Sequence, residues 1–184
     1  MYRMNDEIVI RDKTFELFIP EREILKGIAS VSEKIATDLK GKDPYFICVL
    51  NGAFMFASDL LKMMDFPCEI GFIRLKSYEG VKSAGTIKQI HGFAEDIENR
   101  NVVIIEDIID TGHTMHYLLE QLRERRPASI SIACLLHKPD AAVMPITPDY
   151  AAITIPNDFI VGYGLDYDGH GRNLRNIYKI KNGE

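Results

Sequence analysis

The 184-residue sequence has no long apolar run, and we find no repeat, low-complexity tract or linker in it. Its apolar stretches fall far short of the roughly 20 residues that a membrane-spanning helix needs. No amino-terminal segment combines a basic start with an apolar stretch of signal-peptide length. We therefore expect a protein that is neither exported nor embedded in a membrane.

Positive charge and cysteine are also in short supply. Lysine and arginine number 22 against 27 aspartate and glutamate residues, which gives a formal net charge of −5. A free-standing nucleic-acid-binding protein normally carries a basic stripe, so we expect no nucleic-acid partner. The three cysteines, Cys48, Cys68 and Cys134, are odd in number and lie within apolar stretches. We expect reduced core residues and hence a cytoplasmic location, in a reducing cytosol.

The length and the apolar pattern favour one α/β unit, and we expect residues 1–184 to form a single domain. Apolar positions at helical spacing predict helices at residues 21–40, 53–64 and 115–125. Short apolar or alternating runs predict strands at residues 7–11, 15–19, 45–50, 68–76, 86–91, 102–105, 129–136, 151–155, 159–162 and 176–180. Strands separated by helices indicate βαβ crossovers and a mainly parallel, twisted sheet, with ligands beyond the carboxyl ends of its strands.

The stretch from Val102 to Met115 is the one around which the rest can be organised. Residues 102–105 are apolar without polar alternation, as in a parallel strand that is covered on both faces. We expect Glu106 and Asp107 to leave this strand at the top of the sheet. Two carboxylates so close together repel each other and any phosphate nearby, unless a cation or several hydroxyls intervene. Sugar hydroxyls or Mg²⁺ would satisfy them.

A turn follows the acids. Asp110 comes first, and Gly112 permits a tight path into a helix that we expect to open near Thr114. Unsatisfied amides and the helix dipole make such a terminus a favourable site for an anion. A phosphate fits the turn formed by residues 110–114, although a solvated acidic loop is the structural alternative.

The string of an apolar run, Glu-Asp, two apolar residues and Asp-Thr-Gly-x-Thr resembles the phosphoribosyl pyrophosphate (PRPP) signature of the type I phosphoribosyltransferases, and more narrowly their 6-oxopurine branch. The resemblance implies a parallel sheet with a small hood of N- and C-terminal segments. It also implies that Glu106 and Asp107 hold the ribose hydroxyls and Mg²⁺, and that Asp110 acts on the purine N7 proton. The 5′-phosphate would lie on Asp110, Thr111, Gly112, His113 and Thr114.

Two further strand ends resemble the PRPP-binding loops of this family. Asn51 and Gly52 match a short loop that contacts pyrophosphate through backbone amides, although many members carry lysine in place of Asn51. Ser77 and Tyr78 match the start of a flexible loop that closes over the reacting centre. A ligand-free turn at Gly52 and an unconstrained surface loop after Ser77 are the simpler readings of these residues.

The purine side of the resemblance lies later in the chain. Lys138 matches the lysine that donates to the purine 6-oxo group, although a lone lysine at a strand end is more often solvated. Phe159 and Ile160 match a stacking aromatic and the neighbour whose backbone reads the base edge. Asp166 would contribute to the purine site and hold a second Mg²⁺ through water. Arg172 would contact pyrophosphate, with glycine before it where the family usually has an aromatic.

His113 and His116 are three residues apart on a helical segment, which is compatible with a metal site. No further histidine or cysteine lies near them in the sequence, so we expect solvent-facing residues instead.

The resemblance implies a Mg²⁺-dependent hypoxanthine phosphoribosyltransferase of purine salvage, a pentosyltransferase that joins hypoxanthine or guanine to PRPP and gives IMP or GMP and pyrophosphate. Its partners would be these small molecules and further copies of the chain, in a homodimer or homotetramer with residues 53–64 as a contact surface. The alternatives are a regulatory protein that keeps the PRPP-binding fold to sense nucleotides and bind RNA, and a xanthine-preferring transferase. The sequence does not distinguish hypoxanthine from guanine preference.

Overall fold

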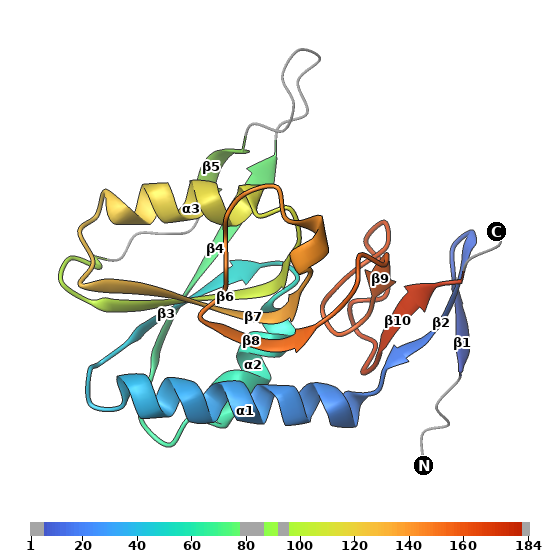
Figure 1. Cartoon of the computed structure of the whole chain (residues 1–184), viewed down its shortest axis with the longest axis horizontal. Coiled ribbons are helices and arrows are strands. Elements are labelled where there is room, and N and C mark those ends of the chain that lie inside the picture. The colour runs from blue at the N-terminus through green and yellow to red at the C-terminus, as the bar shows by residue number, and fades with distance from the viewer. Residues whose placement is uncertain (1–5, 78–86, 92–95, 182–184) are drawn as a thin grey trace.

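The computed structural model of the chain describes residues 6–77, 87–91 and 96–181. A six-stranded sheet forms its centre, and its strand order is β5-β4-β3-β6-β7-β8 (Figure 1). All neighbouring strands are parallel except β4 and β5, which confirms the mainly parallel α/β sheet. These strands are β3 (Tyr45–Leu50), β4 (Glu69–Ser77), β5 (Ile87–His91), β6 (Asn101–Ile109), β7 (Ser129–His137) and β8 (Tyr150–Thr154).

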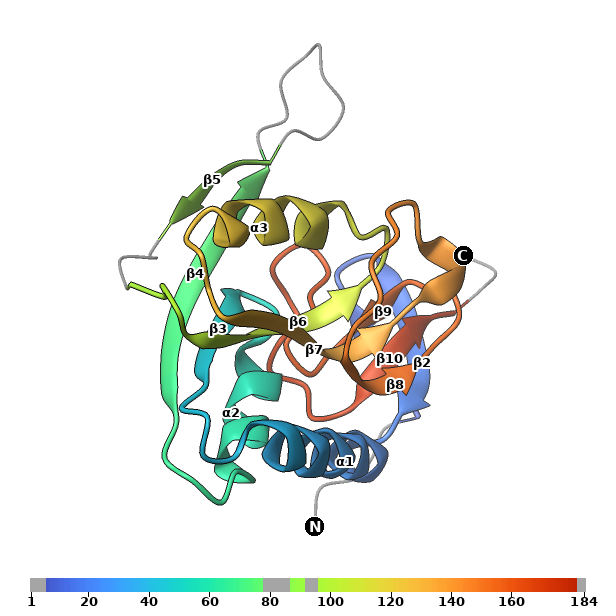
Figure 2. The ribbon, with the colours of Figure 1, turned by 60° about the vertical axis from the view of Figure 1, so that its left-hand side comes forward.

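Three helices cover the two faces of this sheet. Figure 2 shows α1 (Glu21–Leu39) and α2 (Phe54–Lys62) on one face and α3 (His113–Arg123) on the other. The buried apolar positions of α1 recur every three or four residues, as the sequence predicted. The second helix is shorter than predicted at both ends, and α3 begins two residues before the predicted helix, directly after Gly112.

A second, four-stranded sheet stands beside the first. It has the order β1-β2-β10-β9 and is antiparallel throughout. The strands are β1 (Glu7–Ile10), β2 (Lys13–Ile19), β9 (Ile160–Val161) and β10 (Ile177–Ile180), and they pack on a small apolar cluster that includes Phe15 and Val161. The expected hood of N- and C-terminal segments is therefore confirmed.

One prediction about β6 is wrong. We expected Glu106 and Asp107 to leave the strand, but β6 continues to Ile109. Its pairing with β3 stops at Ile105, whereas its pairing with β7 continues to Ile109. A single neighbour is enough to keep this backbone extended, so both acids lie within the last part of β6, where β3 no longer covers one edge.

The cysteines and the helices bear on two other expectations. Cys48 and Cys134 are buried free thiols in the core, as predicted, and Cys68 is a half-buried free thiol. In the described part of the chain, no helix is both long enough and apolar enough to cross a bilayer.

Candidate functional site

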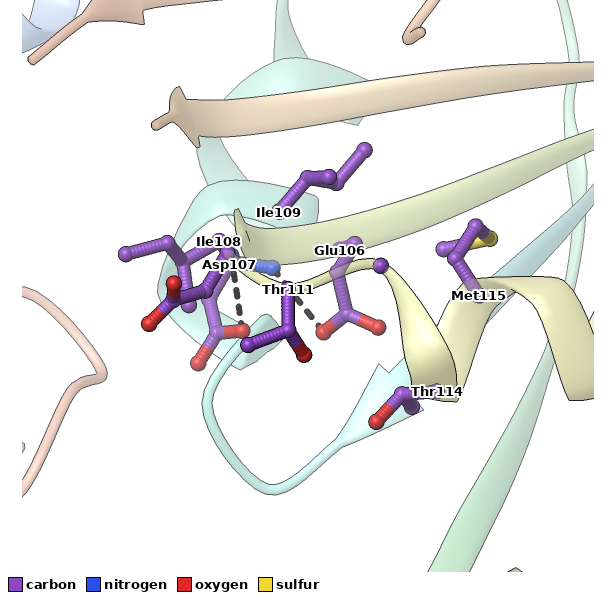
Figure 3. A pocket seen from close by; sticks show the side chains of 9 residues that line it. Glu106, Asp107, Ile108, Ile109, Thr111, Thr114 and Met115 are labelled. Atoms are coloured by element: carbon purple, nitrogen blue, oxygen red, sulfur yellow. Dashed lines mark hydrogen bonds between the residues drawn. The ribbon is translucent and has the colours of Figure 1, made fainter. Parts of the chain in front are cut away.

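A cavity of about 230 Å³ opens where β6 meets α3. In Figure 3 the Glu106 carboxylate and the hydroxyls of Thr111 and Thr114 point toward the same space below the start of α3. The structure thus brings the acid pair and the predicted phosphate turn together in one cavity. Its lining consists of Glu106, Asp107, Ile108, Ile109, Asp110, Thr111, Gly112, Thr114 and Met115.

Gly112 makes the turn into α3 possible. Its φ of +83° lies in the left-handed region that glycine adopts without strain, and α3 begins at the next residue. The segment at residues 143–146 packs behind this turn, because the amides of Val143 and Met144 donate to the Thr111 carbonyl at 3.0 and 2.9 Å. No sequence pattern indicated this support. The result is a braced helix N-terminus of the kind that binds anions.

The acid pair is deeply placed. Glu106 is only 7% exposed, and burial followed by the Asp107 charge raises its pKa well above its ordinary value. Burial also raises the pKa of Asp107, against the lowering effects of hydrogen bonding and of the Arg172 charge. The Asp107 amide donates to Glu106 Oε1 at 3.2 Å, and the Ile108 amide donates to Asp107 Oδ1 at 2.8 Å. Hydroxyl donors or a cation would stabilise the ionised pair.

The Asn51–Gly52 loop lies against this acid pair. A Cβ added to the buried Gly52 would overlap Asp107 Oδ2, and a Cβ added to Gly164 would overlap the Gly52 carbonyl oxygen. Asn51, by contrast, is exposed, and the peptide bond before it is cis. Glycine at position 52 is therefore required by a close approach between β6 and the end of β3, and Gly164 was not singled out from the sequence.

Arg172 and Asp166 pair with each other beside this loop. Arg172 Nη2 lies 2.6 Å from Asp166 Oδ1, and Arg172 Nη1 donates to the Gly164 carbonyl at 2.7 Å. Asp166 Oδ2 accepts from the Gly169 amide at 2.7 Å. A Cβ at Gly171 would lie 2.5 Å from a methyl group of Val161. The packing at this position leaves no room for the aromatic that the family usually has before the arginine.

Lys138 follows β7 and faces Asp110. Its side chain is only 7% exposed, so the alternative of a solvated lysine does not hold. Lys138 Nζ lies 3.6 Å from Asp110 Oδ2 and 3.5 Å from Asn157 Oδ1. Asn157 was missed, because it stands in a short connection after β8 without a motif. A buried ammonium group beside a carboxylate can present a donor and an acceptor to one polar ring edge.

Phe159, two residues after Asn157 in the chain, offers a partly exposed apolar surface. Its side chain is 47% exposed, and its ring centroid lies 5.9 Å from that of Tyr167 and 6.3 Å from that of Phe15. Ile160 is buried on β9, where it pairs with Lys179 of β10. A partly exposed ring held by two others is suited to stacking on a flat ligand.

The remaining predicted residues are Ser77, Tyr78 and the two histidines of α3. Ser77 ends β4 and Tyr78 is outside the described residues, so the predicted flexible loop is not described. His113 is exposed at the start of α3, and His116 Nε2 lies 3.5 Å from Glu120 Oε1. Within residues 6–77, 87–91 and 96–181 no three His, Cys, Asp or Glu side chains gather closely enough to hold a metal ion by themselves.

Comparisons with known proteins bear on the whole of this arrangement. Residues 20–168 match the family described as the phosphoribosyl transferase domain. The hypoxanthine-guanine phosphoribosyltransferase of Lactococcus lactis is 39% identical over 172 residues, which cover 92% of this chain and 93% of that protein.

Solved structures are also similar. A mutant Trypanosoma cruzi hypoxanthine phosphoribosyltransferase in a ternary substrates complex has a TM-score of 0.84 and 38% identity, and the match covers 90% of this chain and 95% of that one. A Staphylococcus aureus hypoxanthine phosphoribosyltransferase has a TM-score of 0.82 and 35% identity, with coverage of 90% and 91%.

Proposed function

The chain belongs to the phosphoribosyl transferase family, and on that premise we propose that it transfers the 5-phosphoribosyl group from PRPP to hypoxanthine or guanine. The products are IMP or GMP and pyrophosphate. Relatives that match over nine-tenths of this chain are named for this substrate pair, which supports the same choice here.

The contact between Lys138 and Asp110 carries the proposal. A 6-oxopurine presents an acceptor at its 6-oxo group and a proton at N7 on one edge, and these two side chains, 3.6 Å apart, complement that edge. Lys138 donates to the oxygen, and Asp110 takes or shares the N7 proton as the glycosidic bond forms. Asp110 also lines the cavity of the phosphate turn, so the base would be held next to the ribosyl group.

Different residues bind the different parts of PRPP. The turn at residues 110–114 binds the 5′-phosphate through backbone amides and the hydroxyls of Thr111 and Thr114. Glu106 and Asp107 accept from the ribose 2′- and 3′-hydroxyls, which relieves the repulsion within the buried pair.

Arg172 and Gly52 would hold the pyrophosphate. The Arg172 guanidinium is paired with Asp166. When pyrophosphate binds, the N–H groups of this guanidinium would donate to its oxygen atoms, in place of the Asp166 carboxylate or in addition to it. The Asn51–Gly52 loop would add backbone amides, which come close to the ligand because residue 52 has no side chain. Phe159 would stack on the purine, and the backbone at Ile160 would read its edge.

The carboxylate chemistry of the site fits Mg²⁺. This ion prefers hard oxygen ligands and is usually held by one or two carboxylates together with substrate oxygens and water, as the acid pair and Asp166 allow. The buried, repelling pair of Glu106 and Asp107 is an environment that a cation stabilises. When bound, Mg²⁺ supplies charge stabilisation for the departing pyrophosphate. The protein groups that assist are Arg172, which adds positive charge, and Asp110, which manages the purine proton.

The same proposal includes the location and the oligomeric state of the enzyme. The three free thiols suit a reducing cytoplasm. We propose a homodimer or homotetramer with the exposed Phe54 of α2 and Met63, directly after this helix, in its contact surface.

Steady-state assays with PRPP, Mg²⁺ and each of hypoxanthine, guanine and xanthine test the function. We expect turnover with one or both of the first two, loss of activity on addition of a chelator, and recovery with excess Mg²⁺. A preference for xanthine would replace the proposed substrate, and absence of product with all three purines would refute the enzyme assignment.

A further inference from the structure

Tyr163 is held in an unusual backbone conformation beside the site. Gly162, Tyr163 and Gly164 all have positive φ, at +106°, +48° and +99°. Glycine adopts such angles readily, whereas for a bulky residue they are uncommon and persist only where the surroundings enforce them. The Tyr163 side chain is 1% exposed, so its packing is the source of that enforcement.

The Tyr163 side chain reaches across to another element. Its hydroxyl donates to Asp59 Oδ2, on α2, the helix that follows the Asn51–Gly52 loop. Asp59 Oδ1 lies 2.5 Å from Lys62 Nζ, and this ion pair orients the carboxylate. Burial and the Asp59 hydrogen bond raise the pKa of Tyr163, so its hydroxyl remains a donor at neutral pH.

The residue after Tyr163 connects this contact to Arg172. The Gly164 amide donates to the Arg172 carbonyl at 2.9 Å, and the Arg172 guanidinium donates to the Gly164 carbonyl at 2.7 Å. The Gly164 α-carbon also packs on the Gly52 carbonyl so closely that a Cβ would overlap it. The hydrogen bond between Tyr163 and Asp59 holds the segment around Gly164 against α2. Gly164 in turn contacts both groups assigned to pyrophosphate, Gly52 and Arg172, and so fixes their positions.

We propose that Tyr163 and Asp59 are positioning residues that fix the distance between the Gly52 loop and Arg172, and so the geometry of pyrophosphate binding. This inference rests on the proposed function for the identity of the ligand. Neither side chain would touch substrate. Lys138 and Asp110 lie after β7 and at the end of β6, outside the contacts that join Tyr163 to Gly52 and Arg172, so the purine half of the site should not respond.

Removal of either partner should therefore separate the two halves of the site. We expect Tyr163→Phe and Asp59→Ala to weaken binding of Mg²⁺–PRPP and Mg²⁺–pyrophosphate by about fivefold, the range of one net hydrogen bond. The KM for the purine should change by less than about twofold, within the scatter of distant sites. Isothermal titration calorimetry with the full chain measures the binding, and steady-state kinetics measures the KM values.

Two matched variants distinguish positioning from a general loss of stability. Tyr150→Phe removes a comparable hydrogen bond, since Tyr150 Oη donates to Asp38 Oδ2 at 2.9 Å between β8 and α1, away from the pyrophosphate residues. It should lower the melting temperature and leave pyrophosphate binding unchanged. Asp59→Asn keeps an oxygen acceptor for Tyr163 and should restore most of the affinity that Asp59→Ala loses.

The double variant Tyr163→Phe/Asp59→Ala should bind pyrophosphate no more weakly than the worse single variant, because both remove the same contact. Unchanged pyrophosphate affinity in folded Asp59→Ala, or an equal rise in the purine KM, would overturn the positioning role. Asp59 lies on the surface of a helix with its side chain 23% exposed, so this variant keeps the test available if Tyr163→Phe fails to fold. A wild-type chain that binds pyrophosphate but makes no nucleotide would refute the proposed function alone.

Discussion

The carboxylate of Asp107 occupies the space in which a side chain at position 52 would begin. Gly52 follows β3 and Asp107 lies in β6, so the two strands present a backbone and a carboxylate to each other at their carboxyl ends. Any side chain on residue 52 must move either the loop or the acid.

Gly52→Ala should lower kcat/KM for PRPP by up to about 100-fold, because a displacement of about 1 Å in a positioned group can cost that much. Steady-state kinetics at saturating purine is the measurement. Gly41→Ala is the matched control, since Gly41 has positive φ but no atom within 4 Å of an added Cβ. The control should lose stability without losing activity, and a Gly52→Ala enzyme of normal kcat/KM would disprove the close approach as a constraint on function.

Asp110→Asn should reduce kcat by roughly 10²- to 10⁴-fold, the usual contribution of general acid–base catalysis. The amide cannot take the N7 proton, which lowers kcat. It keeps the size of the side chain, so the affinity for PRPP should change little. Asp140→Asn, at an exposed position in the 3-10 turn at Pro139–Ala141, controls for the loss of one negative charge nearby. Near wild-type turnover by folded Asp110→Asn would remove this residue from the chemistry.

Lys138→Met should raise the KM for hypoxanthine by roughly 10- to 100-fold, since it deletes a charged hydrogen-bond donor from a buried site. The KM for PRPP should be nearly unchanged, because the phosphate turn and the acid pair are retained. Lys179→Met, in the partly buried ion pair with Glu16 on the hood sheet, is the corresponding control. Equal changes in both KM values would argue against a specific contact of Lys138 with the base.

Glu106 gives a prediction for pH. Its pKa is raised in the folded protein, chiefly by burial, from an ordinary value of 4.5. At a pH between 4.5 and the raised pKa, Glu106 is protonated in the folded state and ionised in the unfolded state. The free energy of unfolding therefore falls as pH rises through that window. Glu106→Gln remains neutral and should escape this loss. Without ligands, it should be more stable than the wild type above the window and similar below it.

Thermal unfolding at about pH 4 and about pH 8 measures the effect, with roughly 2–4 °C expected for each 1 kcal/mol in a chain of this size. Glu124→Gln, an exposed residue at the end of α3, should show no such difference between the two pH values. A Glu106→Gln protein that is less stable than the wild type at the higher pH would contradict the assignment.

Much of the fold could be predicted from local pattern. The spacing of Ile24, Ile28, Val31 and Ile35 predicted α1, and the unbroken apolar run at residues 102–105 predicted a strand that is covered on both faces. The tight turn into α3 also followed from its residues, because Gly112 takes a positive φ without strain between the strand and the helix. The hood, by contrast, was implied only by the family resemblance.

Contacts between segments that are distant in the chain could not be predicted from the sequence. The support of Thr111 by residues 143–146, the partnership of Lys138 with Asn157 and the hydrogen bond from Tyr163 to Asp59 join positions without any common motif. The continuation of β6 to Ile109 was missed for a related reason: pairing with β7 outweighs the low strand preference of Glu106 and Asp107. Such terms depend on the tertiary structure and leave no periodic trace in the chain.

The amides of Asp107 and Ile108 donate to the carboxylates of Glu106 and Asp107, in the part of β6 beyond its last pairing with β3. Ribose hydroxyls would therefore compete with the chain's own backbone for the same oxygen atoms. Binding of the sugar should therefore shift the NMR resonances of these two backbone N–H groups and change their hydrogen-exchange rates.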